Sequence, residues 1–186
     1  MKSMIKAALA AAALMAAASS VHAQSYAGAL VQMSRFNLGS ECASLGTDAD
    51  CDKSANGLKL FAGSTLSDDW RIEAAYIDFG KTKSTVDNAS VKVSASALVA
   101  AAAVTFHPLP ALTLSGKVGI AAVTAKVDGD GESLDEQHPS LYLGLGVDYE
   151  VYKNVRAVLG VDFVRARVAE DKFGIQSVGL GAQMAF

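Results

Sequence analysis

The sequence predicts an all-β fold: an eight-stranded antiparallel up-and-down transmembrane β-barrel. Apolar residues alternate with small or polar residues through most of the chain, as in strands with one apolar face. Short turns alternate with longer polar connections, which is typical of up-and-down barrels that cross a membrane. The 186-residue chain is 51% hydrophobic, yet beyond its N-terminal segment no apolar run is long enough for a membrane-spanning helix.

The N-terminal segment is predicted to be a secretory signal peptide. Two lysines precede an apolar run that has no polar face, and the run closes on Val21, His22 and Ala23, a cleavage pattern of small residues. We therefore assign residues 1–23 to the signal peptide and residues 24–186 to one barrel domain. The residue directly after the cleavage site is Gln24 and not a cysteine, so we expect no lipid anchor.

The mature segment is acidic and holds both cysteines. Without the two signal-peptide lysines it carries 14 of the 16 basic residues and all 19 acidic residues, a formal charge of −5. This charge argues against a nucleic-acid partner, which selects basic surfaces. Cys42 and Cys51 lie close together in a polar segment, which in an exported chain predicts one short disulfide loop. No further ligands are spaced for a metal ion, and we expect no cofactor.

Seven segments alternate clearly enough to assign their faces. In chain order, their apolar faces hold these residues: Ala27, Ala29, Val31 and Met33; Leu58, Leu60, Ala62 and Leu66; Trp70, Ile72, Ala74 and Tyr76; Leu112, Leu114, Val118 and Ile120; Leu141, Leu143, Leu145, Val147, Tyr149 and Val151; Val155, Ala157, Leu159, Val161 and Phe163; Val178, Leu180, Ala182, Met184 and Phe186. The remaining strand is expected over 91–106, where a run of alanines leaves the two faces unassigned.

The opposite faces consist mostly of Gly, Ser and Ala with isolated charges. A soluble sandwich or a lipocalin-like barrel would also alternate, but its second face would be rich in Lys, Glu and Thr to meet water. In hydrocarbon, strands satisfy their backbone groups only as a closed barrel. A barrel of about eight strands has room inside for side chains rather than for a wide channel.

The connections predict two different barrel ends. Short turns at 67–69, 107–111 and 153–154 are expected at one end. Longer polar connections are expected at the other end, at 37–56, 81–90, 128–139 and 169–173. The acidic stretch 128–136 fails the EF-hand pattern, because Pro139 stands where the twelfth position needs Glu. We interpret it as a solvated loop, with weak divalent binding as the alternative.

The last predicted strand ends on an aromatic residue. Phe186 would close the barrel by ending a strand that pairs with the first strand near Tyr26. We expect Phe186 to lie with Trp70 and Tyr149 in an aromatic girdle at the short-turn interface of the membrane.

Two segments resemble a known family. Residues 57–81, GLKLFAGSTLSDDWRIEAAYIDFGK, resemble the second and third strands of the OmpA-like small outer-membrane barrels, with an aromatic and a Gly, a short turn, then Glu-x-x-Tyr and Asp-Phe-Gly. Residues 114–121, LSGKVGIA, resemble the family's fifth strand. The resemblance implies the outer membrane of a Gram-negative bacterium and recognition of the strand ending at Phe186 by the barrel-assembly machinery. Full-length members carry a C-terminal peptidoglycan-binding domain, and we expect none here because the strand pattern runs to Phe186.

The family also implies a charged network that plugs the barrel lumen. The inward positions that match the family are Lys59, Arg71, Glu73 and Lys117. The seventh strand departs from the family, because Val158 and Gly160 stand where an inward Arg and Glu are usual. We expect Asp148, Arg156 and Asp162 to substitute, since charges buried without a partner would be too costly.

The sequence therefore favours a structural outer-membrane barrel, monomeric, that supports membrane integrity and presents surface loops. A narrow pore and a ligand-binding or adhesin-like barrel are the alternatives. A lipid-modifying enzyme is less favoured and we expect no catalytic residues, because His107 and His138 have no Ser or Cys partner in a motif.

Four cations are expected beyond the apolar band, toward the longer connections: Arg35, Lys126, Arg165 and Arg167. Cations at that height suit lipopolysaccharide phosphates, which Arg forks recognise well. Ordinary charge at the loop edge is the alternative interpretation.

Overall fold

A computed structural model of the protein describes residues 24–37, 50–51, 54–86, 89–129, 132–168 and 171–186. The predicted signal peptide and Cys42 lie outside these ranges, as do the side chains of Cys51 and Arg167. The predictions made for them therefore remain predictions.

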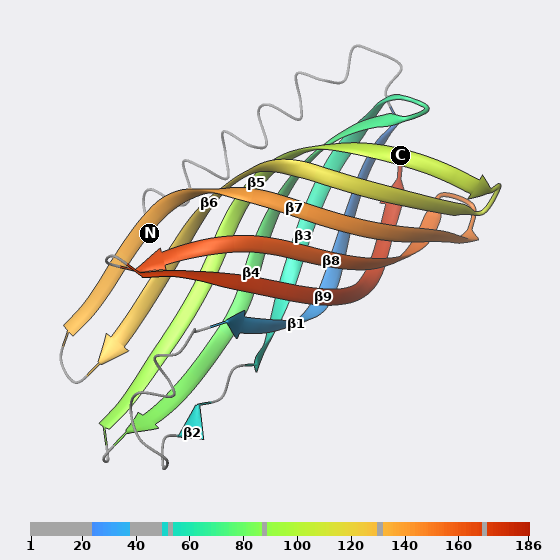
Figure 1. Ribbon diagram of the computed structural model, residues 1–186. Helices are drawn as coiled ribbons and strands as arrows, with labels where there is room; N and C mark the ends of the chain where they lie inside the picture. Colours follow the sequence, from blue (N-terminus) through green and yellow to red (C-terminus); the bar gives the residue numbers. More distant parts are fainter. Residues whose placement is uncertain (1–23, 38–49, 52–53, 87–88, 130–131, 169–170) are drawn as a thin grey trace.

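Eight antiparallel strands form a closed barrel within the described ranges (Figure 1). They are β1 (Ser25–Asn37), β3 (Ser54–Ser67), β4 (Trp70–Val86), β5 (Ala89–Leu109), β6 (Leu112–Gly129), β7 (Glu132–Tyr152), β8 (Val155–Val168) and β9 (Asp171–Ala185). The two-residue strand β2 (Asp50–Cys51) pairs with the loop-end part of β4, at Ser84 and Thr85. No helix in the part of the chain that the structure describes is long and apolar enough to cross a membrane. The predicted fold class is confirmed.

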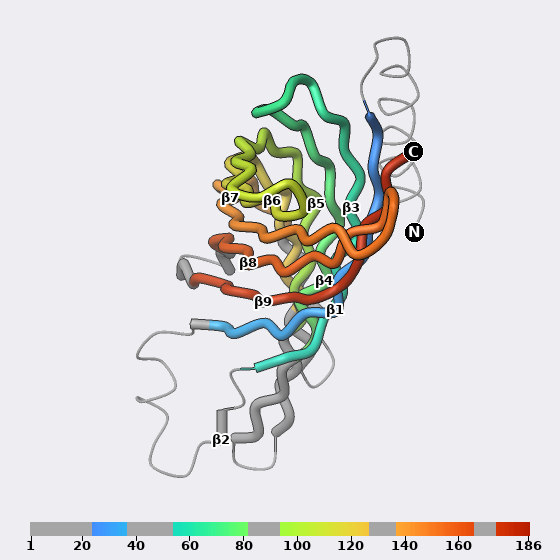
Figure 2. Tube along the Cα trace, turned by 90° about the vertical axis from the view of Figure 1, so that its right-hand side faces the viewer, coloured from blue at the N-terminus to red at the C-terminus, as the bar shows by residue number. Residues whose placement is uncertain are grey.

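The ring closes between the first and last strands. β1 and β9 lie side by side in both views (Figure 1 and Figure 2), and Tyr26 pairs with Ala185. The amide of Phe186 donates to the carbonyl of Ser25 at 2.9 Å, so pairing runs to the end of the strand. Closure gives both β1 and β9 a hydrogen-bonded neighbour on each side, as strands in hydrocarbon require.

The predicted apolar faces point outward. Val31, Ile120, Leu145 and Leu180 are among the exposed apolar side chains on the barrel exterior. The structure also assigns the alanine-rich strand β5, whose faces the sequence left open. Its exposed residues include Leu98, Val104 and Phe106, whereas its buried residues are Ala95, Ala97, Val99, Ala101, Ala103 and Thr105.

The three short turns lie at one end of the barrel, with the end of β9 (Figure 1). The prediction of long loops at the opposite end is wrong for 81–90, 128–139 and 169–173. Strands β4 and β5 pair as far as Val86 and Ala89, and β6 and β7 pair as far as Gly129 and Glu132. Polar side chains mark where the apolar band ends, but they do not stop a backbone ladder from continuing beyond the membrane.

The interior has two zones. Toward the loop end it is mainly apolar, with Phe36, Phe79, Val164 and Ile175 buried beside the uncharged polar residues Ser34 and Ser177. Toward the turn end it is charged, and this zone forms the candidate site described next.

Candidate functional site

Charged side chains from five strands converge in the lumen. Alternation points every second residue inward, so Lys59 of β3, Arg71 and Glu73 of β4, Lys117 of β6 and Asp148 of β7 face the same interior. Asp162 of β8 completes the set. We call these six residues the lumen network.

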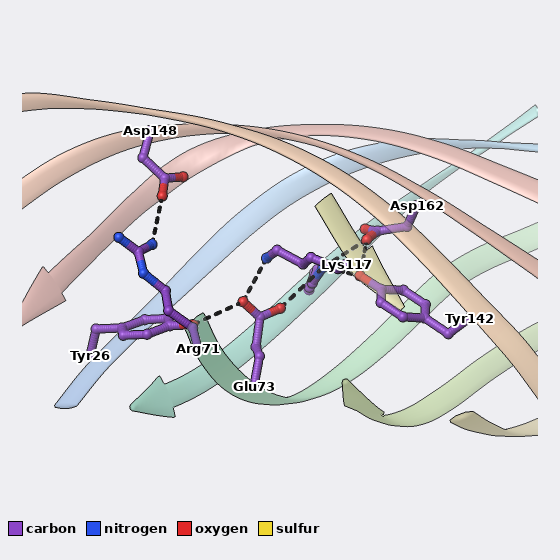
Figure 3. Close-up of polar contacts among 8 residues, drawn as sticks. Tyr26, Arg71, Glu73, Lys117, Tyr142, Asp148 and Asp162 are labelled. Carbon is purple, nitrogen blue, oxygen red and sulfur yellow. Dashed lines mark hydrogen bonds and ion pairs between the residues drawn. The ribbon is translucent and has the colours of Figure 1, made fainter. Parts of the chain in front are cut away.

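The larger part of the lumen network is built around two lysines, of which Figure 3 labels Lys117. The ammonium of Lys59 lies 2.8 Å from a carboxylate oxygen of Asp162 and 3.7 Å from one of Glu73. The ammonium of Lys117 lies 2.6 Å from the other oxygen of Glu73. Glu73 thus links both lysines, and the Lys59 side chain is only 2% exposed.

The second part is the ion pair between Arg71 and Asp148, which lies nearer the turns. Arg71 Nη1 donates to Asp148 Oδ2 at 3.2 Å, and the guanidinium lies 5.6 Å from the centroid of the Tyr26 ring. The Tyr26 hydroxyl donates to Glu73 at 3.4 Å, so it connects the two parts. Three cations therefore face three carboxylates, and the lumen network is formally neutral.

Sequence reasoning missed two tyrosines of this site. The hydroxyl of Tyr142 donates to Asp162 and accepts from Lys59 Nζ at 3.0 Å, and its side chain is fully buried. Tyr26 acts similarly on Glu73. The alternation already placed both on inner faces, and that signal could have identified them, because a buried hydroxyl needs a polar partner.

Asp148, Arg156 and Asp162 were expected to replace the inward Arg and Glu that are usual in the family. Only two of these three residues join the lumen network. Asp148 and Asp162 pair with cations of the lumen network. Arg156 does not join it: its guanidinium lies 3.6 Å from Glu150 and donates to Thr113 Oγ1 at 3.4 Å. The reason is depth, since Arg156 is the second residue of β8 and lies at the barrel mouth.

Within the lumen network every charged side chain is paired with one of opposite sign. Each carboxylate of the lumen network already has a cation partner, and Val158 and Gly160 add no further charge. Among the described residues, no group of three or more His, Cys, Asp or Glu side chains could hold a metal ion. His107 lies at a short turn and His138 at the loop-end part of β7.

The outer membrane protein β-barrel domain family matches residues 4–186 of the chain. The chain belongs to this family. The comparison with curated proteins gives no match. Because the chain belongs to this outer-membrane family, the barrel sits in the lipid bilayer of the bacterial outer membrane. Its exposed apolar exterior faces lipid.

Solved structures share the fold of this outer-membrane barrel. Ail, the attachment invasion locus protein of Yersinia pestis, is 18% identical with a TM-score of 0.57, covering 89% of this chain and all of Ail. Neisserial surface protein A is 18% identical with a TM-score of 0.62, covering 87% of this chain and 97% of that protein. The N-terminal barrel of Pseudomonas aeruginosa OprF is 17% identical with a TM-score of 0.59, covering 89% of this chain and all of that barrel.

Aromatic side chains of the outer-membrane barrel gather near its turn end. Trp70 and Tyr149 are about half exposed on the exterior, and Phe186 is 72% exposed. Phe106 and Tyr152, which sequence reasoning did not single out, are exposed beside the turns as well.

The outward cations are exposed near the loop end. Arg35 of β1 and Arg165 of β8 are separated only by β9, on which they pair with Gln176 and Gly174. They therefore share one patch of the exterior. Lys126 is exposed on β6, three strands from β9.

Proposed function

We propose that the protein is a structural component of the outer membrane, a barrel with a plugged lumen that supports membrane integrity and presents its loop end at the surface. The observation that carries the proposal is the neutral lumen network, in which Lys59, Lys117 and Glu73 are bonded across the interior from three strands. We propose no catalytic role and a monomeric state.

The plug is costly to open. Opening a path along the axis requires Lys59 to leave Asp162 and Lys117 to leave Glu73 while these groups stay shielded from bulk water. Breaking a buried ion pair costs about 3–5 kcal/mol, because it leaves a charge without compensation. A barrel held in this way is closed most of the time.

Conductance in planar bilayers tests the plug. We expect wild type to give little steady conductance, and Lys117→Met to leak more and to lose about 3 kcal/mol of unfolding free energy in detergent. Lys59→Met should lose more, because Lys59 also leaves Asp162 and Tyr142 without their cation. Lys153→Met, which changes an exposed turn cation, is the matched control. A steady wild-type pore that Lys117→Met does not alter would contradict the proposal.

The role in membrane integrity is tested in cells. We expect cells without the protein to admit a hydrophobic fluorescent dye faster than wild type, and expression of the intact gene to restore the barrier. Equal dye entry in both strains would remove this role while leaving the plug itself intact.

A narrow pore is the second candidate, and one observation favours it. Gln32, Ser34 and Ser177 are buried in the lumen on β1 and β9, and their side-chain polar atoms have no protein partner. Such atoms are normally stabilised by ordered water. The conductance of wild type decides between the candidates.

We further propose that lipopolysaccharide contacts the exterior patch around Arg35 and Arg165. Both guanidinium groups are exposed, and Arg forks bind phosphate bidentately. The double variant Arg35→Gln/Arg165→Gln should retain less lipopolysaccharide after detergent extraction, whereas Lys153→Gln at the opposite end should not. Equal retention would indicate ordinary loop-edge charge.

We also propose export by a cleaved signal peptide and a Cys42–Cys51 disulfide. N-terminal sequencing of the mature protein should begin at Gln24. Thiol labelling of the denatured, unreduced protein should find no free thiol, and two labelled thiols would refute the bond.

A further inference from the structure

A cavity of about 330 Å³ opens at the turn end of the barrel, apart from the bonded centre of the lumen network. Its volume is at the lower end of the range of small-molecule sites. Its lining residues come from both ends of the chain and from several strands: Gln24, Tyr26, Thr65, Asp68, Arg71, His107, Asn154, Arg156, Gln183 and Ala185. We call it the turn-end vestibule.

The vestibule holds two guanidinium groups with donors to spare. Arg71 is 8% exposed, and its Nε has no hydrogen-bond partner. Its bond to Asp148 uses only Nη1. Arg156 makes two long contacts, 3.4 Å to Thr113 and 3.6 Å to Glu150, and is more exposed than Arg71. A buried N–H donor without a partner is costly, and Arg71 is one of the residues that line the vestibule.

The other lining groups define what fits. The amide side chains of Gln24, Asn154 and Gln183 can donate further hydrogen bonds. The Asp68 carboxylate also lines the vestibule, and its negative charge would repel an anion bound there. We propose that the turn-end vestibule binds a small molecule through a carboxylate or phosphate head group, which accepts hydrogen bonds from Arg71 and Arg156. Asp68 limits the affinity by repulsion.

The proposed anion site in the vestibule does not depend on whether the lysine–carboxylate pairs of the lumen network close the lumen. The vestibule lies at the short-turn mouth, and its lining includes Tyr26 and Arg71 but neither Lys59 nor Lys117. A ligand there would occupy the mouth without breaking any pair between the lysines and their carboxylates.

Nuclear magnetic resonance of the arginine Nε–H groups in detergent micelles tests the site. Sodium phosphate and sodium acetate are titrated separately into the intact protein at constant ionic strength. We expect saturable shifts of the Arg71 and Arg156 signals with at least one of the two anions, and the more tightly bound anion identifies the head group. Small linear shifts of the Arg71 and Arg156 signals that do not saturate with either anion would overturn the proposal.

Two single substitutions in the vestibule are expected to change its affinity for the anion in opposite directions. Arg156→Gln should weaken binding about tenfold, since a charge-assisted hydrogen bond is lost. Asp68→Asn should strengthen it, because the repulsion is removed. Lys153→Gln removes the same charge from the same end but does not line the vestibule, and it should change the affinity less than about twofold. If Lys153→Gln weakens binding as much as Arg156→Gln, the effect is one of general charge and the site is refuted.

Discussion

At the scale of single residues, Tyr142 is an uncharged residue that contacts two members of the lumen network. Its hydroxyl bonds to both Lys59 and Asp162, and the Lys59 ammonium lies 5.5 Å from the centroid of its ring. The hydroxyl therefore makes a hydrogen bond to each member of an ion pair that is shielded from water.

Tyr142→Phe keeps the ring and removes the hydroxyl. We expect a loss of about 1–3 kcal/mol in unfolding free energy, because Lys59 and Asp162 each lose a hydrogen bond in a buried site. Tyr149→Phe makes the same chemical change on the exposed exterior and should stay within about 0.5 kcal/mol of wild type. Urea titration in detergent measures both. Equal effects of the two changes would mean that the buried hydroxyl adds no stability.

At the scale of elements, β4 carries a bulge near the middle of the strand. The register between β4 and β5 shifts between Asp78 and Lys81. Gly80 has a φ of 85° there, and its amide donates to the Asp78 carboxylate at 2.9 Å. A β-carbon on Gly80 would also meet the backbone carbonyl of Asn56 on β3.

Gly80→Ala should therefore lower the unfolding free energy by about 1–2 kcal/mol, because a left-handed backbone costs an L-residue that much. Gly116→Ala on β6 is the matched control, since its β-carbon would meet nothing within 4 Å. We expect that change to be neutral. If both variants unfold at the same urea concentration as wild type, the bulge tolerates a side chain and the strain argument is wrong.

At the scale of the whole molecule, closure by β9 and β1 is a separate problem from stability. Phe186 faces outward and is 72% exposed, so it contributes little to packing inside the barrel. The strand ending at Phe186 resembles the signal by which small outer-membrane barrels are assembled. We therefore expect Phe186 to act during insertion into the membrane instead.

Phe186→Ala should accumulate poorly in the outer membrane yet refold from urea in detergent. The loss of one interfacial aromatic costs at most about 1.5–3 kcal/mol, and every strand keeps its backbone pairing. Phe106→Ala, a similarly exposed aromatic at the same end, should accumulate normally. Membrane fractionation and heat-modifiable gel mobility measure the two outcomes. Normal membrane levels of Phe186→Ala would exclude the assembly role, and failed refolding would assign the residue to the fold.

The sequence by itself determined the barrel and its two faces. A period of two assigns each side chain to lipid or lumen whatever the partner strand is. It therefore placed Leu145 outside and Lys59 and Glu73 inside before any pairing was known. It could not assign β5, because a run of alanines has no period. It also missed the strand extensions, because polarity marks the membrane edge and not the end of a ladder.

The tertiary structure alone decided which inward groups meet. Lys59 and Asp162 lie 103 residues apart in sequence and on strands that do not pair. Their contact depends on the stagger of all the strands around the ring, which fixes depth across the lumen. That stagger is a property of the closed barrel, and no single segment encodes it. For the same reason Arg156, inward on its strand, lies at the vestibule mouth instead of in the lumen network.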